Sequence, residues 1–149
     1  MTIELTSPAF EDGGTIPEKH TRLGGNASPP LAWAGVPADA AELVLTVQDP
    51  DAPSGTFTHW ILARLDPDLD GLDEGEVPDG AVEGSNDFGE DGYDGPQPPV
   101  GDPPHRYVFT LHALGDESGL GPSAGSDDVD AAVESFGIDR GQLTGRYGR

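Results

Sequence analysis

The sequence predicts a mostly β domain, built from antiparallel strands with one or two short helices. Gly (22) and Pro (15) are abundant among the 149 residues, and both break helices and supply turns. Hydrophobic residues make up 34% of the chain and gather in short runs separated by turn residues, which is typical of short strands. The length suits a single domain, so we treat residues 1–149 as one unit.

Five segments have the apolar patterns of strands. In chain order they are Thr2–Leu5, Leu31–Trp33, Leu43–Gln48, Phe57–Leu65 and Arg106–Leu114. Apolar residues occupy both parities of the third segment, as in a strand that is covered on both faces. Alternation in the fourth segment places His59 on one face with Ile61 and Leu65, and Trp60 on the other face. In the fifth segment, Tyr107 shares a face with the apolar residues, and His105 is next in phase.

The remaining chain is mostly loop. Asp66–Gly95 is acidic and rich in Gly, with a short strand expected near Ala81–Glu83. Gly92–Pro104 contains so much Pro and Gly that we expect irregular structure.

One short helix is expected at Ser126–Phe136. Ser126 suits the N-cap, and Gly137 suits the end of the helix. Val129, Val133 and Phe136 fall on one stripe, which predicts the face that packs against the protein.

The charge of the chain is strongly negative. Asp and Glu number 28 against 7 Lys and Arg, which gives a net charge of −21 at pH 7. Nucleic-acid binding needs a basic surface, so we exclude it. The acidic residues are spread along the whole chain, which favours a halophilic source, because concentrated salt screens their repulsion. An acidic partner for a basic protein is the alternative.

The sequence also bears on the cellular compartment. It has no cysteine, which excludes disulfides, thiolate zinc sites and a cysteine nucleophile. Its first residues have neither the basic nor the apolar segment of a signal peptide. No apolar run reaches the ~20 residues of a membrane span. We therefore expect a cytoplasmic protein without a membrane span.

Histidines and acids stand beside Pro-rich loops at strand ends. Asp49 and Asp51 follow the third strand, His59 lies in the fourth, and His105 and Tyr107 open the fifth. A carboxylate such as Asp49 can fix an imidazole tautomer and aim its other nitrogen at a ligand. Two imidazoles and a phenol around one cavity would suit a phosphate-sized anion. The alternative is a strand histidine satisfied internally and a loop histidine on the surface.

Other chemistries fit the same residues less well. The two acids and two histidines suit a two-His carboxylate metal site, and Ser54 is the serine nearest to the acids for a hydrolase. However, no G-x-S-x-G motif occurs. Asp66–Gly71 matches the first half of a calcium loop, but Val77 stands where the bidentate Glu is needed. We expect no metal and no cofactor.

Several longer motifs carry a family resemblance. They are Gly25–Trp33 (GNASPPLAW), Asp49–Gly55 (DPDAPSG), His59-Trp60, Gly92–Gly101 (GYDGPQPPVG), His105–Phe109 (HRYVF) and Gln142–Tyr147 (QLTGRY). In this order they resemble the phosphatidylethanolamine-binding protein family, the family of the Raf kinase inhibitor protein. The similarity is strongest to its bacterial and archaeal branch and covers nearly the whole chain.

The resemblance implies a sandwich of antiparallel sheets and a small surface pocket that binds phosphate-like anions. The positions that match the pocket of the family are Asp49, Asp51, Pro53, His59, Gly95, Pro96, Pro99, His105 and Tyr107. Arg106 matches the family motif as a scaffold residue. Asp102 departs from the pattern, and its negative charge near the mouth is expected to weaken anion binding.

The function expected is therefore non-catalytic binding of a small anion, a phosphoryl head group or a carboxylate. The resemblance adds a regulatory or inhibitory role toward a kinase- or protease-like partner, and prokaryotic relatives suggest a homodimer. Two alternatives stay open. One is an inhibitor that acts through surface loops, and the other is a hydrolase with His59 as base and Asp49 as its orienting acid.

Overall fold

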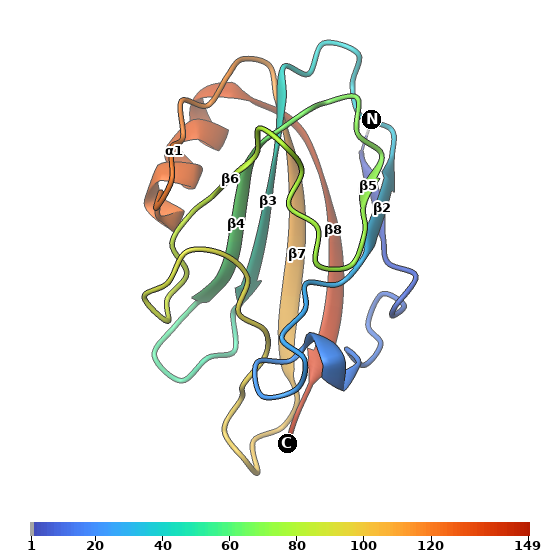
Figure 1. The fold of residues 1–149 in the computed structure, drawn as a ribbon, viewed down its shortest axis with the longest axis vertical. Coiled ribbons are helices and arrows are strands. Elements are labelled where there is room, and N and C mark those ends of the chain that lie inside the picture. The colour runs from blue at the N-terminus through green and yellow to red at the C-terminus, as the bar shows by residue number, and fades with distance from the viewer. Residues whose placement is uncertain (1) are drawn as a thin grey trace.

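Two antiparallel sheets and one α-helix make up the computed structural model, which describes residues 2–149 (Figure 1). The strands are β1 (Glu4–Thr6), β2 (Leu31–Ala34), β3 (Glu42–Asp49), β4 (Phe57–Leu65), β5 (Gly71–Leu72), β6 (Val82–Glu83), β7 (His105–Leu114) and β8 (Gly137–Tyr147), and the helices are a 3-10 turn at Glu18–His20 and α1 (Ser126–Phe136). The larger sheet has the order β6-β4-β3-β7-β8, and the smaller has the order β1-β2-β5. The predicted mostly β, antiparallel fold is confirmed.

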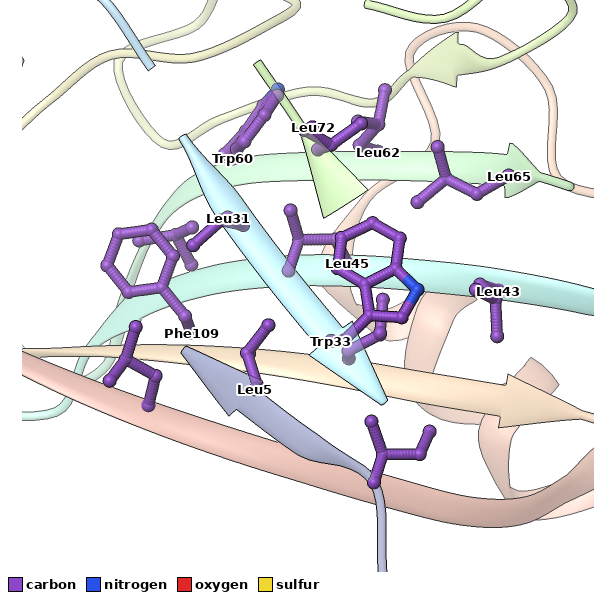
Figure 2. Packing of buried hydrophobic residues seen from close by; sticks show 14 of the residues in the cluster. Leu5, Leu31, Trp33, Leu43, Leu45, Trp60, Leu62, Leu65, Leu72 and Phe109 are labelled. Carbon is purple, nitrogen blue, oxygen red and sulfur yellow. The ribbon is translucent and has the colours of Figure 1, made fainter. Parts of the chain in front are cut away.

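A hydrophobic core fills the space between the two sheets. Leu5, Leu31 and Trp33 of the small sheet face Leu45 and Phe109 of the large sheet (Figure 2). Each of these side chains is at most 5% exposed. Full burial of one such side chain contributes roughly 1.5–3 kcal/mol, so this layer is the main source of stability.

Helix α1 covers the opposite face of the large sheet. Val129 and Ala132 of the helix pack on Val44 and Ile61, which explains why β3 is apolar at both parities. The expected N-cap is wrong by one residue. Gly125 caps the helix, its N–H donates to Asp128 Oδ2 at 2.9 Å, and Ser126 is already helical. The helix ends at Gly137 as predicted.

Strand β8 was not predicted from the sequence. It pairs with β7 from Tyr147 opposite His105 to Gly137 opposite Leu114. Its sequence is polar and interrupted by glycine, which gives a weak strand signal. Gly145 is required here, because a Cβ at this position would stand 2.5 Å from Ile16 Cγ1.

Two bulges in β4 change the alternation expected for that strand. Leu43 lies opposite Leu65 but Leu45 lies opposite Leu62, so β4 has one extra residue, and Arg64 there has a φ of 59°. Leu65 consequently joins the core between the sheets rather than the helix-facing group that contains Ile61. The expected common face of these two residues is wrong for this reason.

The second bulge inserts His59. Val47 lies opposite Trp60 and the next residue, Gln48, lies opposite Thr58. The alternation of β4 predicted that His59 and Trp60 point to opposite faces of the sheet. This prediction does not hold, because the His59 ring contacts Tyr107, which belongs to the same core between the sheets as Trp60. Bulges commonly re-aim a side chain beside a functional site.

Candidate anion-binding site

A cavity of about 240 Å³ lies at the end of the large sheet where β3 ends and β7 begins. Its lining combines aromatic rings and prolines with a few polar groups: Asp49, Ala52, Pro53, Ser54, Phe57, His59, Phe88, Gln97, Pro98, Pro99, His105 and Tyr107. Cavities for drug-sized ligands start at about 300 Å³, so this one suits a smaller molecule.

Six of the nine positions predicted for the pocket line this cavity, namely Asp49, Pro53, His59, Pro99, His105 and Tyr107. Asp51, Gly95 and Pro96 lie outside the lining. Each of these three forms hydrogen bonds with a residue that is also outside the lining, namely Arg106, Asn26 and Arg22 respectively.

Asp49 and His105 form a buried pair across β3 and β7. The Nδ1 of His105 donates to Asp49 Oδ2 at 2.7 Å, and Asp49 Oδ1 accepts the Asp51 N–H at 2.7 Å. The two side chains are 5% and 6% exposed. A carboxylate therefore fixes the ring of His105, as expected for Asp49.

The second nitrogen of His105 also meets a carboxylate. Its Nε2 lies 3.0 Å from Oδ2 of Asp102, a residue of the loop that precedes β7. Burial by itself would lower the pKa of His105, but the bonds to Asp49 and Asp102 outweigh burial and raise it. Because each ring nitrogen of His105 faces a carboxylate oxygen, the imidazolium form is favoured.

His59 has a different environment. Its Nδ1 donates to the backbone carbonyl of Asp94 at 2.7 Å, and its ring lies 5.3 Å from the ring of Tyr107 and 5.6 Å from that of Phe88. Burial lowers the pKa of His59, so the neutral form with its proton on Nδ1 is favoured. The orienting group of His59 is thus the Asp94 carbonyl, whereas the hydrolase alternative assigned that role to Asp49.

Within residues 2–149, no other side chain forms a hydrogen bond with Nε2 of His59 or with the hydroxyl of Tyr107. Both residues line the cavity. Burial raises the pKa of Tyr107, so its hydroxyl keeps its proton and can donate. One acceptor and one donor are therefore free to meet a ligand.

Asp51 lies outside the cavity lining and holds Arg106 through three hydrogen bonds. Its carboxylate accepts two bonds from the Arg106 guanidinium, at 3.0 and 2.8 Å, and one from the Arg106 N–H at 2.9 Å. These bonds lower the pKa of Asp51 to about 2. The pair ties the loop after β3 to the start of β7, which agrees with a scaffold role for Arg106.

A second buried network supports the wall that carries Gly95. Asn26 donates to Asp94 Oδ1 at 2.9 Å and accepts the Gly95 N–H at 2.8 Å, and Asn86 donates to Asp94 Oδ2 at 2.9 Å. The next residue, Pro96, accepts the Arg22 N–H at 3.0 Å. This network fixes the Asp94 carbonyl that orients His59.

Phe88 is a lining residue that sequence reasoning missed. It packs against Phe57, with ring centroids 4.8 Å apart, and the Arg22 guanidinium lies 4.1 Å from its centroid. It stands alone as an apolar residue in the polar segment 85–92, and that isolation is the signal that could have found it. Phe57, in the same strand as His59, also lines the cavity and was not predicted to do so.

The metal-site alternative has no support from this geometry. Within the part of the chain that the structure describes, no three His, Cys, Asp or Glu residues are grouped to hold a metal ion. Asp51 is committed to Arg106, and Asp49 to His105.

Comparison with known proteins agrees with the fold. The family model for phosphatidylethanolamine-binding protein matches residues 6–148. The chain belongs to the phosphatidylethanolamine-binding protein family. It is 45% identical over 152 residues to a UPF0098 protein of Methanothermobacter thermautotrophicus, with 99% of both chains covered. The crystal structure of Escherichia coli YbcL, described as a member of the mammalian PEBP family, superposes with a TM-score of 0.93 at 31% identity, and the superposition covers 100% of this chain and 99% of that one.

A third relative bears on location. A Mycobacterium tuberculosis protein whose name includes the word lipoprotein is 37% identical over 145 residues, which is 97% of this chain and 72% of that protein. In the present chain, no helix among residues 2–149 has the length and apolar character needed to cross a membrane. The cytoplasmic location expected from the sequence therefore stays a prediction.

Proposed function

We propose that this protein binds a small anion, a phosphate or a phosphoryl head group, in the cavity between His59, His105 and Tyr107, and that it does so without catalysis. The observation that carries the proposal is the convergence of these three side chains on one small cavity with largely apolar walls. Low-dielectric walls strengthen each polar contact made inside such a site.

Each polar group has a defined part in binding. Tyr107 donates its hydroxyl proton to one anion oxygen, and the imidazolium of His105 supplies positive charge. His59 is an acceptor in its neutral form, so a second anion oxygen can approach its Nε2 only with a proton between them. Binding is therefore coupled to the uptake of one proton, or to the delivery of one by the ligand.

Membership of the family supports a wider role for the protein. We infer a regulatory or inhibitory module whose partner, a kinase- or protease-like enzyme, presents a phosphorylated or acidic group. A net charge of −21 opposes anion capture at long range, so the contacts inside the cavity must supply the affinity. Concentrated salt in a halophilic cytoplasm would screen the opposing field.

The test is an NMR titration of the histidine ring signals with inorganic phosphate and phosphorylethanolamine, at pH about 6.5 in about 2 M KCl. We expect saturable shifts of the His59 and His105 signals and none with ethanolamine alone. His112 is the internal control, because it lies on β7 outside the cavity lining.

Variants complete the test. His59→Ala combined with His105→Ala should abolish phosphate binding, whereas His112→Ala should leave the affinity unchanged. Phosphate binding that survives in the double variant would contradict the proposal. So would the absence of any shift up to tens of millimolar phosphate, and inhibition through surface loops would then become the leading interpretation.

A further inference from the structure

The two carboxylates that hold His105 are not equivalent. Asp49 is 5% exposed at its side chain and is fixed by a second bond, from the Asp51 N–H. Asp102 is 39% exposed at its side chain, and its carboxylate has no partner other than His105 within residues 2–149. The first acid is part of the scaffold, whereas the second can leave without breaking another contact.

The loop that carries Asp102 is held in place by hydrogen bonds that do not involve the Asp102 side chain. Gly101 has a φ of 90°, and its N–H donates to the carbonyl of Arg149 at 2.9 Å. The Arg149 Nε in turn donates to the Pro98 carbonyl at 2.7 Å. The backbone is thus held by bonds of its own, and a rotation of the Asp102 side chain is enough to free His105.

We propose that Asp102 is an internal ligand of the anion site, and that an incoming phosphoryl group binds by exchanging with its carboxylate at Nε2 of His105. This inference rests on the proposed function. The exchange leaves the His105 cation paired in both states, so the empty site has no buried, unsatisfied imidazolium donor. Repulsion between the arriving anion and Asp102 favours the outward rotation of the displaced side chain.

The exchange also sets the ligand class. A simple carboxylate such as acetate would replace the bond between Asp102 and His105 by another carboxylate–imidazolium bond, so the exchange gains little binding free energy. A phosphoryl group has more oxygens and can carry two negative charges, so it can bond His105, His59 and Tyr107 at once. The site is therefore selective for phosphoryl groups over monocarboxylates, and Asp102 is the residue that imposes the selection.

The test compares Asp102→Asn and Asp102→Ala with Asp39→Asn. Asp39 is an exposed acid in the loop before β3, and the first residue of β3 pairs with Leu114, at the opposite end of β7 from His105. The Asp39 variant therefore removes the same charge far from the cavity. Calorimetric titration with inorganic phosphate should give about tenfold tighter binding for both Asp102 variants, or about 1.4 kcal/mol. Acetate binding should become measurable in them, and Asp39→Asn should stay within about twofold of the parent.

Two NMR measurements separate the outcomes. The side-chain carboxylate signal of Asp102 in the parent protein should move in step with the His105 ring as phosphate saturates the site. The His105 pKa should fall in both Asp102 variants and not in Asp39→Asn. Two results would overturn the exchange alone, provided that the parent protein binds phosphate. One is an Asp102 carboxylate signal that stays fixed during the titration, and the other is phosphate binding by the Asp102 variants that is no tighter than binding by Asp39→Asn. Loss of phosphate binding in the parent and in all variants overturns the proposed function as well.

Discussion

Gly95 packs directly against the backbone carbonyl of His20, with no room for a methyl group between them. The same carbonyl accepts the Tyr93 hydroxyl at 2.6 Å, and His20 itself is fully buried. The last residue of the 3-10 turn at Glu18–His20 therefore supports the cavity wall through backbone contact, and Gly95 lies outside the cavity lining.

A methyl group at this contact should disturb both stability and binding. We expect Gly95→Ala to lower the free energy of unfolding by about 1–3 kcal/mol, since overpacking costs this much. Phosphate should also bind more weakly, because the neighbouring Asp94 carbonyl orients His59. Urea denaturation and calorimetry measure the two effects. Gly121→Ala is the matched control, because a Cβ there meets no atom within 4 Å. Equal urea midpoints for the two variants would refute the packing explanation.

The pair of Asp49 and His105 predicts a pH-dependent stability. Because the pKa of His105 is raised in the folded state, its stabilisation is complete below the unfolded value near 6.5 and is lost as the pH rises through the folded value. Asp49→Asn should therefore cost about 2 kcal/mol at pH 6 and less at pH 9. Urea titrations at both pH values test this, with Asp39→Asn as the charge control. A cost that is the same at both pH values would show that the charge of His105 is not involved.

Proton uptake at His59 predicts how anion affinity depends on pH. Sulfate is a suitable probe, because it carries no proton of its own in this range. Since the pKa of His59 is lowered in the free protein, a bound sulfate must draw in one proton. Its affinity should fall by nearly tenfold per unit between about pH 6.5 and 8. Calorimetry in two buffers of different ionisation enthalpy counts the protons. A flat pH profile would exclude a bond between the anion and His59.

The acidic surface predicts that salt stabilises the fold. At −21 the folded chain repels itself, and at about 1 M salt the Debye length is only about 3 Å. The Tm should rise steeply from about 0.05 M to 1 M KCl and then level off. The double variant His59→Ala with His105→Ala should show the same rise, which would exclude chloride binding in the cavity as its cause. A Tm that does not change over this range would argue against a salt-adapted protein.

Strong local patterns explain which elements were predictable. Strands such as Leu43–Gln48 and the helix at Ser126–Phe136 have apolar residues at the right spacing, so their places follow from sequence. Strand β8 is stabilised by pairing with β7 and by the close approach of Gly145 to Ile16, and neither relationship is visible along the chain. Tertiary contact outweighs its weak strand propensity.

Six of the residues that line the candidate site could be named from the sequence, whereas their hydrogen bonds could not. Asp49, His59 and His105 could be named because they stand beside Pro-rich loops at strand ends. Which acid orients which histidine depends on strand register, and a bulge at His59 cannot be inferred from alternation. The place of Phe88 depends on how a long loop returns across β4, and no local pattern fixes that path.

The pairing of β8 has a consequence for the order of folding. Strand β7 carries His105 and Tyr107, and its neighbours are β3 on one side and β8 on the other. The chain near residues 13–16 then bonds the far edge of β8, with the Gly13 N–H donating to the Thr144 carbonyl at 2.7 Å. Contacts between segments so distant in sequence form slowly, because a long loop must close first. We therefore expect the edge of the large sheet at β8 to form late, and a nascent chain without residues 137–147 would lack the strand that pairs with β7.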